Sequence, residues 1–141
     1  MCHCDESKDY PICCGRFIEG REYPQTPLEL MRSRYSAHVL HKWDYIKNTM
    51  ADDFEKPHRA TLFIKLEILD AQETQVEFKA YYLQRNKLWV LHERSDFLTI
   101  NEKWIYVSGT LFDEPSRTIA LNATCPCDSG KKFKNCHGVQ K

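Results

Sequence analysis

The sequence lacks the features that mark several classes of protein. It has 5 glycines and 6 prolines among 141 residues, too few for a low-complexity or collagen-like chain. No apolar run approaches the roughly 20 residues that a membrane-spanning helix requires. The first six residues contain neither the basic nor the apolar segment of a secretory signal peptide. We therefore expect no membrane span and a cytoplasmic location.

The chain also lacks net charge. Lysine and arginine number 20, and aspartate and glutamate also number 20, which argues against a globally basic protein that binds nucleic acid. Hydrophobic residues make up 42% of the chain, enough for a folded core rather than a disordered tail. The length suits one domain of ordinary size.

Cysteine is absent from the 110 residues between Cys14 and Cys125, although the chain has seven cysteines. A disulfide framework would need an even number of cysteines and an oxidising compartment, and neither is evident. Thiols gathered at both ends, one set next to a histidine, are typical of metal sites. The two sets are Cys2, Cys4, Cys13 and Cys14, and Cys125, Cys127, Cys136 and His137.

The two sets repeat each other when the first is shifted by 123 positions. Both copies then read C-x-C-D-x-x-K-x-aromatic-x-x-C-[C/H]-G, with Cys14 replaced by His137. Cysteine and histidine replace one another as zinc ligands but not in a disulfide. The adjacent ligands converge only if the backbone turns between them, and we expect the following glycine, Gly15 or Gly138, to permit that turn.

Each set supplies four nitrogen or sulfur donors, enough to close a tetrahedral shell around one zinc ion. We therefore predict two zinc ions per chain, both structural, because catalytic zinc keeps one position open. Free cysteines at mobile termini are the simplest alternative. An iron–sulfur cluster is another, and His137 argues against it.

The C-terminal copy, Cys125-Pro126-Cys127-Asp128-Ser129-Gly130 through Cys136-His137-Gly138, resembles the SEC-C zinc motif at the C-terminus of the translocation ATPase SecA. The N-terminal copy is looser, with His3 in place of the usual proline. His3 is therefore a competing ligand for the first site. In SecA the motif is a protein-contact module, so the resemblance implies a protein partner, with the translation or translocation machinery as candidates.

Between the two sets, helices precede strands. Residues 16–25 read as a connecting loop. Thr26, Pro27 and Glu29 form a helix start with a capping box, so we predict a helix to about Leu40 and a shorter one over 44–50. Alternation with a period of two then predicts antiparallel strands near 64–68, 76–82, 88–94 and 104–110. The expected fold class is α+β, a curved antiparallel sheet packed on the N-terminal helices, with a small zinc-binding knuckle at each end.

This layout resembles the nuclear-transport-factor-2-like cone, which often encloses a pocket. The segments 31–37 and 91–95 also resemble the YchJ group of bacterial proteins, which carry such a domain with SEC-C motifs at the ends. We expect three units: an N-terminal SEC-C-like motif over 1–20, the cone over 21–118 and a SEC-C motif over 119–141. The central part has enough apolar residues for its own core, so we expect the metals to fold only the ends.

Two functions follow from these observations. The first is a zinc-binding protein that serves as a protein-interaction module. The second is a small-ligand-binding protein or an enzyme that uses the cone pocket, with His92 and Glu93 as the sharpest candidates. Alternation places these two side chains on opposite faces of a regular strand, so they cannot pair directly, and we expect no enzyme. Arg32 and Arg34 could grip an acidic ligand, but such residues are more often solvated or paired.

The C-terminal unit is locally basic. Four lysines oppose one aspartate between Cys125 and Lys141, a formal charge of +3 (Lys131, Lys132, Lys134 and Lys141 against Asp128). These lysines could simply favour the thiolate form of the ligands, or they could dock an acidic protein surface or RNA phosphates. We expect Tyr10 and Phe133 to pack over their own metal turns rather than to stack on bases.

Overall fold

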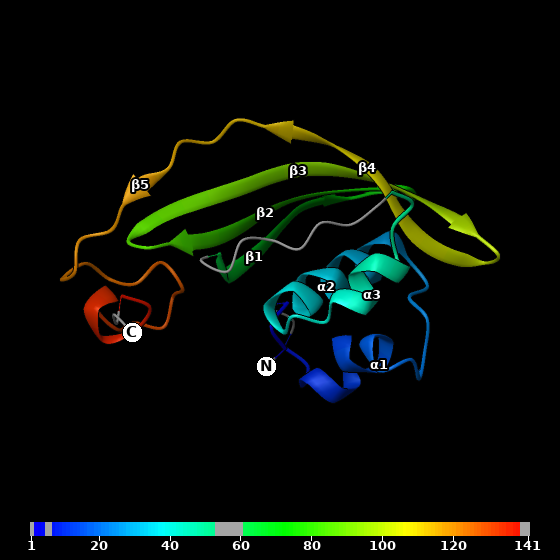
Figure 1. The fold of residues 1–141 in the computed structure, drawn as a ribbon, viewed down its shortest axis with the longest axis horizontal. Coiled ribbons are helices and arrows are strands. Elements are labelled where there is room, and N and C mark those ends of the chain that lie inside the picture. The colour runs from blue at the N-terminus through cyan, green and yellow to red at the C-terminus, as the bar shows by residue number, and fades with distance from the viewer. Residues whose placement is uncertain (1, 5–6, 53–60, 139–141) are drawn as a thin grey trace.

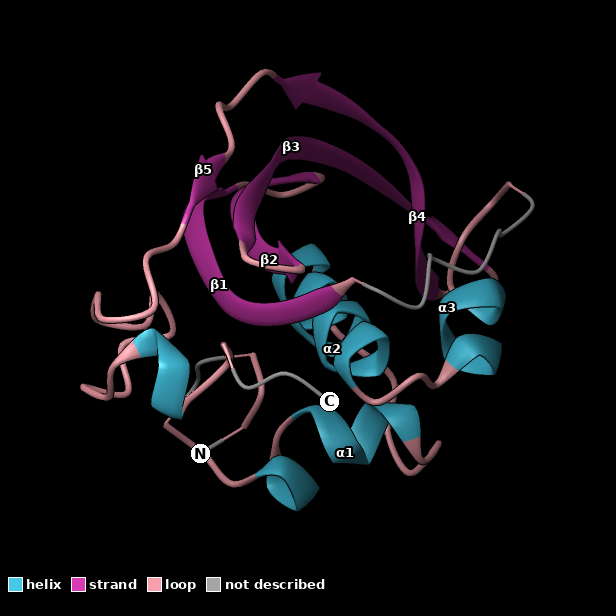
Figure 2. Ribbon diagram, turned by 60° about the vertical axis from the view of Figure 1, so that its left-hand side comes forward, coloured by secondary structure: helices cyan, strands magenta, loops and turns pink. Residues whose placement is uncertain are grey.

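The computed structural model describes residues 2–4, 7–52 and 61–138. It has an α+β fold in which a curved antiparallel sheet wraps over the N-terminal helices (Figures 1 and 2). A cysteine-rich unit lies at each end of the chain. The predicted fold class is therefore confirmed. Asp5 of the repeat and Lys141 of the basic patch lie outside the described residues.

The central helix α2 spans Pro27–Val39 and begins as predicted. The Thr26 hydroxyl accepts a hydrogen bond from the Glu29 amide at 3.1 Å, and the Glu29 carboxylate accepts one from the Gln25 amide at 2.7 Å. Helix α3 spans Trp43–Asn48, packs against α2 and buries Ile46.

A short helix, α1, spans Cys14–Ile18, so the prediction that 16–25 is only a connecting loop was wrong at its start. Five residues are too few to show a helical period in the sequence. The helix follows directly from the turn between Cys13 and Cys14, and it buries Phe17.

The sheet contains β1 (Leu62–Ala71), β2 (Gln75–Gln84), β3 (Lys87–Ile100) and β4 (Lys103–Phe112), paired antiparallel in that order. The predicted strands are confirmed, but β3 runs six residues further than the sequence indicated. A register shift between Asp96 and Phe97 interrupts its pairing with β4, and such a bulge increases the local twist. The two-residue strand β5 (Arg117–Thr118) pairs with the start of β3 and was not predicted.

The two faces of the sheet bury different cores. The concave face, with Val76, Phe78 and Ala80, packs on α2. Leu83 lies three positions after Ala80 and therefore on the opposite face. There, Leu83 and Leu88 pack with Ile119 and with the C-terminal unit, including Phe133.

The N-terminal cysteine knuckle packs directly on the main core. Cys2, Cys4, Cys13 and Cys14 form one buried cluster with α2 and the concave face of the sheet. The C-terminal unit belongs instead to the smaller second cluster, and Figure 1 shows it set apart from the N-terminus. The expectation that both metal sites fold only the ends therefore does not fit the N-terminal unit. In the described part of the chain, no helix has the length and apolar character to cross a membrane.

Candidate metal centres

The two cysteine-rich units repeat each other in backbone structure as well as in sequence. The Cys2 amide donates to the Lys8 carbonyl at 2.8 Å, and the Cys125 amide donates to the Lys131 carbonyl at 2.8 Å. Each unit then forms one turn of 3-10 helix, η1 over Tyr10–Ile12 and η2 over Phe133–Asn135. The 123-residue repeat is thus a structural repeat.

The turn that brings adjacent ligands together is made by a cysteine itself. Cys13 has φ −114° and ψ −113°, and Cys136 has φ −130° and ψ −107°. These values are neither helical nor extended, and they carry the next side chain toward the same centre. The predicted turn exists, but the residue that makes it is the cysteine two positions before the glycine.

The glycine after each pair is needed for space. Neither Gly15 nor Gly138 has a left-handed φ. A Cβ on Gly15 would lie 2.7 Å from the Tyr10 carbonyl oxygen and 2.9 Å from its ring, and one on Gly138 would lie 2.6 Å from the Phe133 oxygen and 2.7 Å from its ring. These contacts also confirm that both aromatic side chains pack over their own metal turns.

The N-terminal unit gathers four thiols, all buried. Their sulfur atoms lie within 4.8 Å of one another, with Cys4 Sγ 3.7 Å from Cys13 Sγ and Cys13 Sγ 4.0 Å from Cys14 Sγ. A tetrahedral zinc site with bonds of about 2.3 Å has sulfur atoms about 3.8 Å apart. The donors therefore fit a zinc ion.

His3 lies outside this group. Its side chain is exposed, and its ring packs edge-on against Tyr10 with the centroids 6.1 Å apart. The structure thus brings the cysteines together without it.

Cationic side chains surround the N-terminal group. Arg32 of α2 donates to the Cys4 carbonyl at 2.7 Å, and Arg16 of α1 donates to the Cys13 carbonyl at 3.1 Å. The Ser36 hydroxyl lies 3.6 Å from Cys2 Sγ. Four thiolates with one divalent ion would carry a net charge of −2, and these contacts would hold such a centre in place. Arg16 also forms ion pairs with Glu22 and Glu29.

The C-terminal unit gathers three thiols and one imidazole. His137 Nδ1 lies 3.2 Å from both Cys125 Sγ and Cys136 Sγ, and Cys127 Sγ lies 3.6 Å from Cys136 Sγ. Cys125 is buried, but the other three are only half-buried. This group is therefore more open to solvent than the N-terminal one.

Within the described residues, none of the seven cysteines forms a disulfide. Burial raises the pKa of Cys13 to about 12 and the pKa of Cys125 to about 11. The Cys14 pKa is also raised, by its hydrogen bond with Cys4 and by burial. A bound divalent cation would supply the positive charge that the thiolates need, and its binding would release protons.

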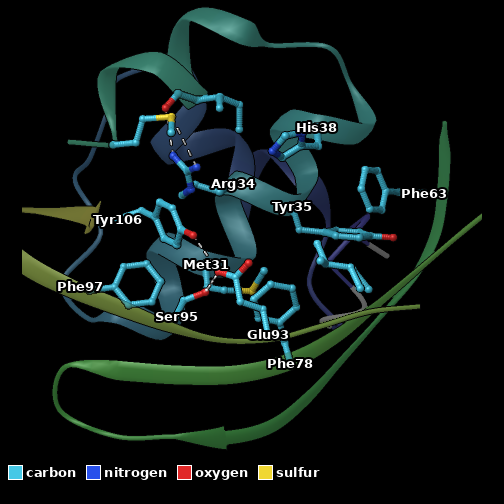
Figure 3. Close-up of a pocket in the computed structure, with 14 residues that line it drawn as sticks. Met31, Arg34, Tyr35, His38, Phe63, Phe78, Glu93, Ser95, Phe97 and Tyr106 are labelled. Carbon is cyan, nitrogen blue, oxygen red and sulfur yellow. Dashed lines mark hydrogen bonds between the residues drawn. The ribbon is translucent and has the colours of Figure 1, made fainter. Parts of the chain in front are cut away.

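A cavity of about 250 Å³ lies between α2 and the concave face of the sheet (Figure 3). Glu93 points into it, whereas His92 lies on the opposite face, 2.8 Å from Glu77 and 3.1 Å from Glu114. The pairing of β2 with β3 is regular here. The prediction that His92 and Glu93 point apart is therefore confirmed.

Sequence reasoning missed most of the polar groups of this cavity. Ser95 and Tyr106 come from β3 and β4 and contact Glu93, which requires the strand register to be known. Among the described residues, Arg34 pairs with no carboxylate; it donates to the Ile46 carbonyl at 2.9 Å and to the Thr49 hydroxyl at 2.7 Å.

Comparison with known proteins agrees with this architecture. Residues 26–109 match the family described as "YchJ, middle NTF2-like domain", and residues 122–138 match the SEC-C motif. The chain is 37% identical to a UPF0225 protein from Serratia proteamaculans, over 98% of this chain and 97% of that protein. It is 33% identical to a UPF0225 protein from Photorhabdus laumondii, over 98% of both chains.

Two solved structures share the fold. A SEC-C motif containing protein from Rhodopseudomonas palustris has a TM-score of 0.70 and 28% identity, over 79% of this chain and 98% of that one. Another, from Psychrobacter arcticus, has a TM-score of 0.63 and 27% identity, over 99% of this chain and 95% of that one. The predicted resemblance to the YchJ group is confirmed by these matches together with the curved sheet and the terminal cysteine groups. The chain therefore belongs to the UPF0225 family, with a YchJ-type middle domain and a C-terminal SEC-C motif.

Proposed function

We propose that the protein binds two structural zinc ions and serves as a protein-interaction module. Thiolate and imidazole donors suit zinc, and four donors close each shell without a position for water. Neither ion would then activate water for hydrolysis. The first ion would be held by Cys2, Cys4, Cys13 and Cys14, and the second by Cys125, Cys127, Cys136 and His137.

One observation carries the metal assignment. The two units share the turn geometry at Cys13 and Cys136 and the same ligand spacing, while the last ligand changes from Cys14 to His137. A thiol and an imidazole have in common that both bind zinc, so a metal explains why this position accepts either. The units 1–20, 21–118 and 119–141 are our proposed division of the chain, with the first unit docked on α2.

The more open C-terminal unit is the proposed contact surface. Lys131, Lys132 and Lys134 are exposed, and within the described residues none of them forms an ion pair. Asp128 of this unit already forms an ion pair with Lys65 of β1, with 2.7 Å between Oδ2 and Nζ. The zinc-loaded unit would therefore present these lysine charges to a partner, and an acidic segment of another protein complements them.

Seven cysteines without a disulfide among the described residues suit a reducing compartment, so we propose that the protein acts in the cytoplasm. Candidate partners are proteins of the translation or translocation machinery. RNA phosphates are the other ligand that these lysines fit, and nuclease treatment separates the two classes.

We expect the zinc-loaded protein to capture a partner through the lysines of its C-terminal unit. The triple variant Lys131→Glu, Lys132→Glu and Lys134→Glu should retain both zinc ions but lose capture by at least about tenfold, because it reverses the charge that an acidic surface recognises. Capture from a nuclease-treated lysate of the producing cells, followed by identification of the retained proteins, measures this. Added salt should weaken the capture.

Cys136→Ser should lose capture as well, since it collapses the turn that holds the lysines. His92→Ala is the matched control, because His92 lies on the far side of β3 from the cavity and outside both metal units. Capture that survives the lysine reversal, or that His92→Ala abolishes in a folded protein, would count against this surface.

A further inference from the structure

The cavity between α2 and the sheet has the size and the walls of a ligand site. Its volume of about 250 Å³ exceeds the roughly 150 Å³ of an apolar cavity that holds benzene. Aromatic rings line much of it: Tyr35, Phe63, Phe78 and Phe97. Tyr35 and Phe63 meet edge to face, with centroids 5.8 Å apart. Such walls suit a flat molecule of one or two rings.

One carboxylate enters this apolar space and is held in place there. Glu93 Oε2 accepts hydrogen bonds from the Ser95 hydroxyl at 2.6 Å and from the Tyr106 hydroxyl at 2.9 Å (Figure 3). Among the described residues, nothing donates to Glu93 Oε1. The second oxygen is therefore an acceptor that a bound molecule could use.

The backbone of β4 leaves room for this carboxylate. Gly109 lies opposite Ser95 in the sheet, and a Cβ on Gly109 would overlap the carboxylate of Glu93. The glycine has no left-handed φ, so space rather than conformation explains its place. The site is thus built around Glu93 from two strands.

The charge of Glu93 is balanced inside the cavity. Arg34 also lines the cavity. Its guanidinium donates hydrogen bonds to Ile46 and Thr49 at the end of α3, and it lies over the Tyr106 ring, 4.9 Å from the centroid. Within the described part of the chain, Arg34 and Glu93 make no direct ion pair. Burial and the nearby Arg34 lower the pKa of His38 to about 4, so this third polar group is neutral. One positive and one negative charge leave the cavity with no net charge.

We propose that this cavity binds a small uncharged aromatic molecule that donates an N–H or O–H hydrogen bond to Glu93. The rings supply the affinity, and Glu93 selects for the donor. The negative charge of Glu93 would repel a carboxylate ligand, and the positive charge of Arg34 would repel an ammonium ligand. None of the residues that line this site belongs to the metal groups or to the proposed docking surface.

The test compares indole with benzofuran, which has the same two-ring shape but an oxygen atom in place of the N–H donor. The zinc-loaded full chain is titrated with each, and amide shifts of the cavity residues are followed by NMR. Indole should bind at least about tenfold more tightly, the effect of one hydrogen bond to a charged acceptor. Glu93→Gln, which replaces one oxygen with an amide nitrogen, should remove this preference. His92→Gln, the adjacent residue on the opposite face, should keep it.

Equal binding of the two probes by the wild-type protein would overturn the proposal. So would the absence of any cavity shift at millimolar indole, or a Glu93→Gln protein that keeps the full preference. Should Glu93→Gln fail to fold, the relative affinity of the wild-type protein for the two probes still tests the proposal.

Discussion

Cys13→Ser is expected to destabilise the whole chain, whereas Cys136→Ser, the equivalent position of the repeat, should loosen only the C-terminal unit. Cys13 lies in the main core with α2 and the concave face of the sheet, while the C-terminal unit joins the small cluster around Leu83. Loss of the first metal would leave buried thiols and a cavity in that core. The free energy of unfolding should fall by at least about 3 kcal/mol for Cys13→Ser.

Urea unfolding and amide hydrogen exchange measure this difference. In Cys136→Ser, the amides of β2 and β3 should remain protected while residues 119–138 exchange faster. In Cys13→Ser, protection should fall throughout the sheet. Equal losses in the two variants, or a larger loss in Cys136→Ser, would show that the two sites do not differ in this way.

Gly138→Ala is expected to abolish metal binding at the second site, although glycine is not a ligand. The new methyl group would lie 2.6 Å from the Phe133 carbonyl oxygen and 2.7 Å from its ring, and Phe133 is fully buried. The turn that aligns Cys136 and His137 must then open. Zinc content should fall from about two ions to about one per chain, as measured by mass spectrometry of the metal.

Gly15→Ala should remove the other ion for the same reason. Gly20→Ala is the control: Gly20 has φ +81° but open space around it, so alanine should cost about 1 kcal/mol of stability and no zinc. Retention of both ions in Gly138→Ala would mean that crowding at this glycine does not govern the site.

Local patterns predicted the two cysteine-rich groups and the main elements well. The spacing of the cysteines identified both groups, because each unit is short and its ligands are close in sequence. The start of α2 at Thr26 and Pro27 was equally clear, since the capping hydrogen bond lies within four residues. Alternation also placed His92 and Glu93 on opposite faces.

Long-range packing could not be predicted in this way. Nothing near Cys13 indicates that its unit packs on α2, and nothing near Cys136 indicates the opposite face of the sheet. The partners of Glu93 depend on strand register, which brings Tyr106 and Gly109 to β3 from the next strand. The roles of Gly15 and Gly138 were misjudged because a crowded approach and a left-handed φ both favour glycine.

Each terminal group is expected to close around one zinc ion. Elemental analysis combined with X-ray absorption at the zinc edge tests it on protein purified without chelator. We expect two zinc ions per chain that share seven sulfur ligands and one nitrogen, with sulfur at about 2.3 Å and nitrogen at about 2.0 Å. A single zinc ion, iron in either group, or a shell containing oxygen would show that the two groups are not closed zinc sites.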